Sequence, residues 1–184
     1  MIRRSVLALA FAAVAAPALA QFDTMTQKPI VKAVREGDEE KVRQALLKGE
    51  NPNQVDSSGR PLLMIAVMDG QVAVVDALLK GGSVVDGVDR EGYTSLIRAA
   101  ERGDYDIADM LLKRNAKPSA QTRHGVTPLM VAARLGHAEI VRLLLDRKAD
   151  PNVPDFTGRT ALSYARQNNR ASIVALLRKA GARE

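Results

Sequence analysis

The stretch Thr127-Pro128-Leu129-Met130-Val131-Ala132-Ala133 decides the fold. Threonine is a common helix cap, and proline fits the first helical position because its missing N–H has no partner there. Leu129, Ala132 and Ala133 then follow at the i, i+3 and i+4 spacing of one helix face. Gly136 predicts where this short helix ends, since glycine readily adopts the left-handed conformation.

A second helix follows directly. Ile140, Val141 and the pair Leu144-Leu145 form another apolar stripe, on a helix that we expect to run to about Arg147. Residues 150–158 are polar and turn-rich, which predicts a loop or short hairpin. Helices of about nine residues are marginal alone in water. The pair must therefore bury its apolar faces against neighbouring pairs.

The same pattern recurs along the chain with a period of 33 residues. Three columns of identical residues keep this period: Gly59, Gly92, Gly125 and Gly158; Leu63, Leu96, Leu129 and Leu162; and Ala66, Ala99, Ala132 and Ala165. Columns that stay in phase indicate units that offer the same apolar faces on both sides, so we expect the units to stack.

The stretch from Thr127 to Asn152 resembles the ankyrin repeat almost end to end, and the resemblance extends from about Met25 to Glu184. It implies an all-α solenoid of about five stacked helix-turn-helix units with short hairpin loops. The repeat domain would occupy residues 21–184. Its units would lie near residues 23–55, 56–88, 89–121, 122–154 and 155–184, with the first and last as solvent-facing caps.

The chain departs from the family pattern in two columns. The family's Thr-Pro pair is Pro61-Leu62, Thr94-Ser95 and Thr160-Ala161 in the other units. The histidine that usually follows the motif's leucine is replaced by Met64, Ile97, Met130 and Ser163. This substitution puts in question the hydrogen bonding that the histidine gives in the family.

Residues 1–20 predict a cleaved signal peptide. Arg3 and Arg4 precede an apolar stretch over residues 6–16, and Ala18-Leu19-Ala20 matches a cleavage site that would leave Gln21 first. The apolar stretch is shorter than the ~20 residues that span a bilayer. We therefore expect export to the periplasm, with release from the cell as an alternative and with both the general secretory and the twin-arginine routes open.

Positive charge is unevenly distributed. The 184 residues carry a net charge of +6, and loss of Arg3 and Arg4 with the signal would leave +4. Residues 21–121 sum to −2 and residues 122–184 to +6. Such a basic end either steers an acidic partner or is an ordinary solvated face.

The residues that catalysis needs are scarce. The chain has no cysteine and only His124 and His137, and it lacks the sequence motifs of nucleophile elbows, phosphate loops, dinucleotide sites and zinc proteases. We predict no enzymatic activity, no cofactor and no metal. His137 matches a structural position of the family, whereas His124 lies in a predicted loop, where it contacts either a partner or water. Basic stretches interleaved with aromatics are absent, so we expect no nucleic-acid partner.

Resemblance to the ankyrin family implies that a partner protein docks along the concave side, formed by loop tips and first helices. Matched column by column, that surface contains Arg60, Met68, Asp69, Arg90, Glu91, Tyr93, Glu101, Arg102, Arg123, His124, Val126, Arg134, Leu135, Phe156 and Arg159. The same columns include Ser57, Ser58, Thr157, Gln167 and Asn168.

This mixture of arginines and aromatics is enriched at binding hot spots. The resulting hypothesis is a monomeric, non-enzymatic binding module without stable membrane insertion, in which arginines grip an acidic segment and Tyr93 and Phe156 are apolar anchors. Two alternatives stay open: an inhibitor or immunity-type protein that blocks an enzyme or toxin, and an enzyme with an unrecognised site that includes His124.

Overall fold

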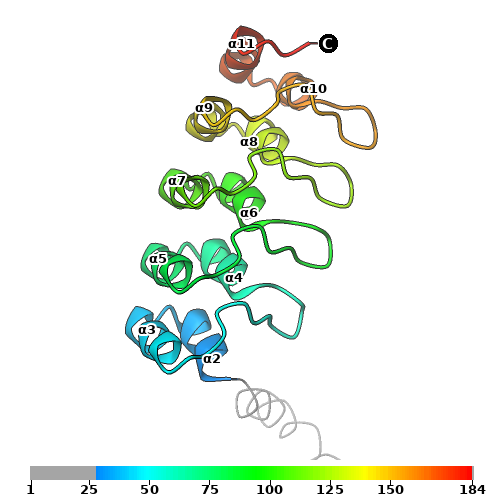
Figure 1. Cartoon of the computed structure of the whole chain (residues 1–184). Coiled ribbons are helices and arrows are strands. Elements are labelled where there is room, and N and C mark those ends of the chain that lie inside the picture. Colours follow the sequence, from blue (N-terminus) through cyan, green and yellow to red (C-terminus); the bar gives the residue numbers. More distant parts are fainter. Residues whose placement is uncertain (1–27, 184) are drawn as a thin grey trace, which may run out of the picture.

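The chain forms a stepwise stack of helix pairs. The computed structural model describes residues 28–183, and in that part ten helices are present, with no strand beyond two isolated bridges, Val55 with Pro61 and Val88 with Thr94. The predicted all-α repeat solenoid is therefore confirmed (Figure 1). The predicted signal peptide lies outside the described residues.

The helices form two rows. The inner row consists of α2 (Pro29–Glu36), α4 (Leu62–Met68), α6 (Ser95–Arg102), α8 (Pro128–Leu135) and α10 (Ala161–Gln167). The outer row consists of α3 (Glu39–Leu47), α5 (Val72–Lys80), α7 (Tyr105–Lys113), α9 (Ala138–Asp146) and α11 (Ala171–Lys179). Loops connect successive pairs and project together beyond the inner row (Figure 1).

Three inner helices, α6, α8 and α10, begin at a threonine cap, as their sequences predict. The Thr127 side chain accepts a hydrogen bond of 3.3 Å from the Met130 N–H at the start of α8, and Thr94 and Thr160 cap α6 and α10 in the same way. Gly136 ends α8 with φ of 94°, a conformation that suits glycine because it has no Cβ. The short helices are thus fixed at their ends by local chemistry.

One apolar core runs through all five pairs. The leucine and alanine columns that define the repeat are buried in every unit in which they occur. Met64, Ile97 and Met130, which replace the family's histidine, are also buried. Apolar packing therefore fills the space of the missing polar side chain, and the stack extends without an interruption in its core.

The loops repeat as faithfully as the helices. In each of four loops a backbone N–H donates to the carbonyl four residues on, as from Asp56 to Arg60 at 3.0 Å. Neighbouring loops are joined by backbone bonds, from Arg123 N to the Glu91 carbonyl at 3.0 Å and from Phe156 N to the His124 carbonyl at 3.1 Å. The loops and the inner helices thus form the two walls of a groove.

Candidate functional site

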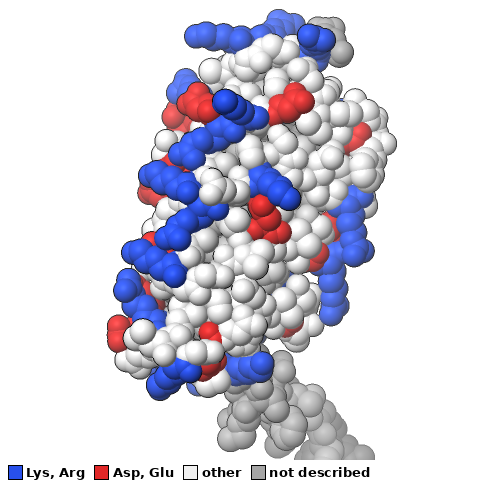
Figure 2. Space-filling view, viewed as in Figure 1, with Lys and Arg blue, Asp and Glu red and all other residues white. Residues whose placement is uncertain are grey.

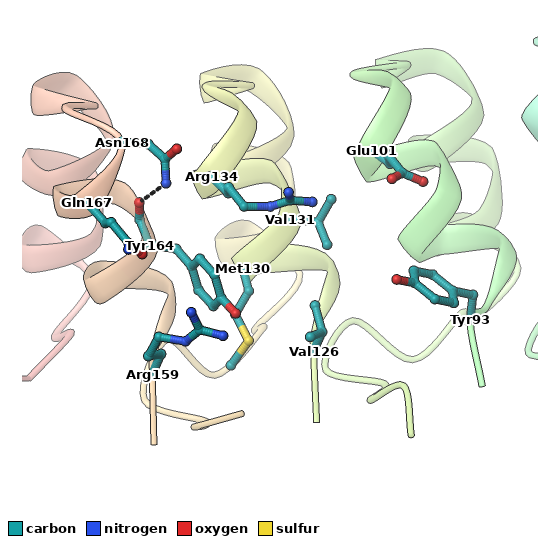
Figure 3. Close-up of a pocket in the computed structure, with 10 residues that line it drawn as sticks. All are labelled: Tyr93, Glu101, Val126, Met130, Val131, Arg134, Arg159, Tyr164, Gln167 and Asn168. Atoms are coloured by element: carbon teal, nitrogen blue, oxygen red, sulfur yellow. Dashed lines mark hydrogen bonds between the residues drawn. The ribbon is translucent and has the colours of Figure 1, made fainter. Parts of the chain in front are cut away.

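A pocket of about 460 Å³ lies in the groove, against α6, α8 and α10 (Figure 3). Its lining residues are Tyr93, Glu101, Val126, Met130, Val131, Arg134, Arg159, Tyr164, Gln167 and Asn168. The sequence columns named seven of these, and the structure brings those seven together from three consecutive units. Met130, Val131 and Tyr164 also line the pocket, although the family columns matched to the concave side do not include them.

In the second unit, the buried carboxylate of Asp56 already binds Arg60, one of the arginines predicted to bind a partner. Asp56 has no exposed side-chain surface, and its Oδ2 accepts hydrogen bonds from Arg60 Nη2 at 2.7 Å, Arg60 Nε at 2.9 Å and Arg35 Nη2 at 3.3 Å. Burial raises the pKa of Asp56, but the hydrogen bonds and charge of Arg60 outweigh burial, so the net pKa is lowered. Arg60 therefore stabilises its own loop, because its Nε and Nη2 donate to Asp56 instead of to a partner.

The third unit also pairs its loop aspartate with an arginine, but this arginine lies on the inner helix instead of in the loop. Asp89, which is equivalent to Asp56, accepts from Arg98 Nη2 at 3.1 Å. Arg98 also pairs with Glu101 at 3.0 Å and lies over the Tyr93 ring, 3.7 Å from its centroid. Arg98 thus positions two predicted groove residues. The sequence columns missed it because the equivalent residues Ile65, Val131 and Tyr164 differ in chemistry.

In the fifth unit, a tyrosine shares the carboxylate. Asp155 Oδ2 accepts from the Tyr164 hydroxyl at 2.7 Å and from Arg159 Nε at 3.2 Å, and Arg159 lies 4.7 Å from the Tyr164 ring centroid. Burial raises the pKa of Asp155, but hydrogen bonds from Thr157, Tyr164 and backbone N–H groups lower it well below its usual value. Burial and the bond to Asp155 raise the pKa of Tyr164. Arg159 is therefore partly committed as well.

The fourth unit has no such carboxylate. Thr122 occupies the position, and its hydroxyl accepts the backbone bonds of the turn, from His124 N at 3.3 Å and Val126 N at 3.1 Å. The positions that carry arginine in other units are here Val126 and Val131. The fourth unit therefore has neither the loop carboxylate nor the arginines that bind it, which leaves this part of the pocket apolar.

The predicted arginines consequently differ in availability. Arg102 Nη1 donates to the Met68 carbonyl at 2.7 Å, and Arg90 Nη2 donates to the Ser57 carbonyl at 3.4 Å. Arg123 and Arg134 are exposed, and within residues 28–183 their guanidinium groups have no hydrogen bond or ion pair. Both lie in the fourth unit, at the basic end of the groove.

The remaining predicted residues lie on the loop wall or at the far end of the groove. Phe156 is 75% exposed and lies over Gly125, where an added Cβ would be 2.8 Å from the Phe156 Cδ1. Phe156 does not line the pocket. His137 Nε2 lies 3.3 Å from the Glu101 carbonyl and connects two units, in keeping with its expected structural role. His124 and Glu91 are exposed on loops, Leu135 is half-buried at the end of α8, and Met68 and Asp69 lie at the end of α4.

Lysines and arginines on the outer helices form a different surface. Figure 2 shows them along the edge that α3, α5, α7 and α9 occupy, interleaved with acidic side chains. Lys80 pairs with Asp76 at 2.6 Å, and Lys113 and Arg147 pair with Asp109 at 2.6 and 2.8 Å. This edge is thus largely neutralised within the chain.

Two further features concern metals and membranes. No group of three or more histidine or acidic side chains that suits a metal ion occurs within residues 28–183. The same residues include no helix whose length and hydropathy would let it cross a bilayer.

Comparison with known proteins identifies the repeat. A family model described as ankyrin repeats (3 copies) matches residues 30–122 and 118–183, which together cover nearly the whole described stack. No curated protein matches the chain.

Proposed function

The chain belongs to the ankyrin repeat family, and from that premise we propose that it is a non-enzymatic module that holds an acidic segment of another protein along its concave groove. Ankyrin repeats are generally protein–protein interaction modules, and proteins of this family are typically non-enzymatic. The observation that carries the proposal is the pocket that three consecutive units build together.

Physical chemistry supports this use of the groove. The pocket combines apolar side chains with arginine and tyrosine, the residue types that dominate binding hot spots. Its walls are helices fixed by caps and by one continuous core, so little conformational entropy is lost when a partner binds. Residues 122–184 carry net positive charge, which favours an acidic segment.

A triple variant tests the groove directly. Arg102→Glu, Arg134→Glu and Gln167→Glu change one exposed residue on each of α6, α8 and α10 and make the groove more acidic. We expect this variant to lose the partner that the unmodified protein captures from a periplasmic extract, as identified by mass spectrometry. Its circular dichroism spectrum should be unchanged, because the three side chains point away from the core.

A matched control has the same changes in charge on the outer row. Lys113→Glu, Arg142→Glu and Ser172→Glu lie at exposed positions of α7, α9 and α11. This control should capture the partner as well as the unmodified protein does. Equal capture by the groove variant, or equal loss by the control, would refute the groove as the binding surface.

Export is the second part of the proposal, and the sequence of residues 1–20 supports it. We expect the protein recovered from the periplasm to begin at Gln21 in N-terminal sequencing. Protein that begins at Met1 and stays in the cytoplasm would contradict this part and leave the groove untouched.

A further inference from the structure

Arg134 has an equivalent in the first unit that shows what an arginine in this column does. Arg35 on α2 lies three repeats earlier in the sequence. Its Nη2 is 3.3 Å from Oδ2 of Asp56, the buried carboxylate of the next unit. An arginine at this position of an inner helix therefore reaches the carboxylate at the base of the neighbouring loop. The equivalent carboxylate for Arg134 is Asp155.

Arg134 does not make this pair, and at Asp155 the Tyr164 hydroxyl donates where Arg35 donates at Asp56. Asp155 Oδ2 accepts from the Tyr164 hydroxyl and from Arg159 Nε, and its Oδ1 accepts from the Thr157 N–H and hydroxyl and from the Arg159 N–H. Asp56 also accepts five hydrogen bonds, and one of its donors is Arg35. In the second unit, Ile65 occupies the position of Tyr164 and cannot donate to Asp56. The tyrosine thus takes the site that Arg134 would otherwise fill.

The surroundings of Arg134 define what could replace Asp155. Its side chain extends beside Val131, and Val126 and Met130 lie on the side of the pocket toward the loops (Figure 3). Glu101, the acidic residue of the lining, is held by Arg98 at 3.0 Å. An incoming group therefore meets a guanidinium with its donors available, directly next to an apolar surface.

We propose that Arg134 is the carboxylate receptor of the groove, and that the partner presents an aspartate or glutamate next to an apolar side chain that enters the pocket. This inference rests on the proposed function and narrows it to one residue and one ligand chemistry. The partner's carboxylate takes the place on Arg134 that Asp56 takes on Arg35, with N–H groups of the guanidinium donating to its oxygens. The adjacent apolar side chain lies against Val126, Met130 and Val131.

A peptide selection provides the probe. Random dodecapeptides displayed on phage are selected on the purified protein and counter-selected against the triple groove variant, so that only groove-dependent sequences remain. We expect the recovered peptides to share an acidic residue beside a leucine, methionine or aromatic residue. One such peptide is then synthesised with a fluorophore, and its affinity is measured by anisotropy.

Two single variants at equivalent positions of the repeat test whether Arg134 binds the carboxylate. Arg134→Gln should weaken the peptide roughly tenfold or more, as expected for loss of a charge-assisted hydrogen-bonded pair. Arg35→Gln is the matched control, because its guanidinium bonds Asp56 in the first repeat interface, and it should leave peptide affinity unchanged. Replacing the peptide's acid by its amide should cost as much as Arg134→Gln, with no further loss when both changes are combined.

Tyr164→Phe tests the competition for Asp155. The variant keeps the ring that lines the pocket but removes the hydroxyl donor, so Asp155 becomes available to Arg134. We expect severalfold weaker peptide binding, with thermal unfolding as the check that the stack stays folded. Unchanged affinity in this folded variant would contradict the proposed competition.

The outcomes separate the two proposals. Groove-dependent peptides that lack an acid, or that bind the Arg134→Gln variant as tightly as the unmodified protein, would overturn the receptor and leave the groove as a protein-binding site. Failure to recover any groove-dependent peptide would overturn both.

Discussion

The second and fourth units share one backbone and differ in how they treat charge. In the second, Asp56 binds the loop backbone through Oδ1 and two arginines through Oδ2. In the fourth, Thr122 makes the corresponding backbone bonds with a single hydroxyl. The turn therefore needs only one acceptor oxygen. The second carboxylate oxygen neutralises arginines, and where it is absent, valines replace the arginines of the other units.

The largest expected effect tests the apolar core that the units of the stack share. Leu96→Ala and Leu129→Ala remove side chains that are buried to the same degree in adjacent units. Each should lower the free energy of unfolding by about 2–5 kcal/mol through lost transfer energy and a cavity. Urea denaturation measures both. A large loss for one and none for the other would show that the units do not have equivalent cores.

An intermediate effect tests what differs between the second and fourth units. Asp56→Asn removes the charge that Arg60 and Arg35 share, and it should cost about 1–3 kcal/mol. Thr122→Asp should also destabilise the fold, because Val126 cannot neutralise a new buried carboxylate. Urea denaturation measures the free energy of unfolding of both variants. Stabilisation by Thr122→Asp would refute the argument that acid and arginine are lost together.

Acid should reveal the same carboxylates. The pKa values of Asp56 and Asp155 are lowered in the folded chain, so the unfolded chain binds protons more readily than the folded one. Their stabilisation is present above the ordinary aspartate pKa of about 4, and it is lost as pH falls through the lower folded values. The free energy of unfolding should therefore decrease below about pH 4. In the Asp56→Asn variant, the free energy of unfolding should decrease less over the same pH range. A pH-independent free energy would contradict this assignment.

The smallest effect lies on the outer row. Leu47 is 88% exposed, in a column that elsewhere contains Lys80, Lys113, Asp146 and Lys179. Leu47→Lys should change the unfolding free energy by no more than about 0.5 kcal/mol, the usual range for surface positions. A loss above 1 kcal/mol in thermal or urea unfolding would show that Leu47 packs more closely than its exposure indicates.

Sequence periodicity predicted the scaffold well and the charge network poorly. The threonine caps, Gly136 and the leucine columns depend on local or repeated chemistry, so the sequence shows them directly. The bond between Arg35 and Asp56 joins two units and depends on loop closure, which a column comparison does not reveal. This is why Arg60 and Arg159 were grouped with partner-binding arginines although buried aspartates hold them.

The pocket floor was hidden for a similar reason. Met130 and Val131 lie outside the family columns matched to the concave side; they are buried, yet one edge of each faces the groove. Tyr164 carried a usable signal, since an aromatic residue replaces aliphatic or arginine side chains in its column. Its hydroxyl bond to Asp155 requires the folded fifth unit and becomes evident only in three dimensions.

A crystal structure of the protein with a groove-selected peptide would test the account most directly. The prediction is a peptide carboxylate bonded to the Arg134 guanidinium, with the neighbouring apolar side chain against Met130 and Val131. A peptide bound to the outer helices, or one in the groove whose acidic groups leave Arg134 without a partner, would contradict it.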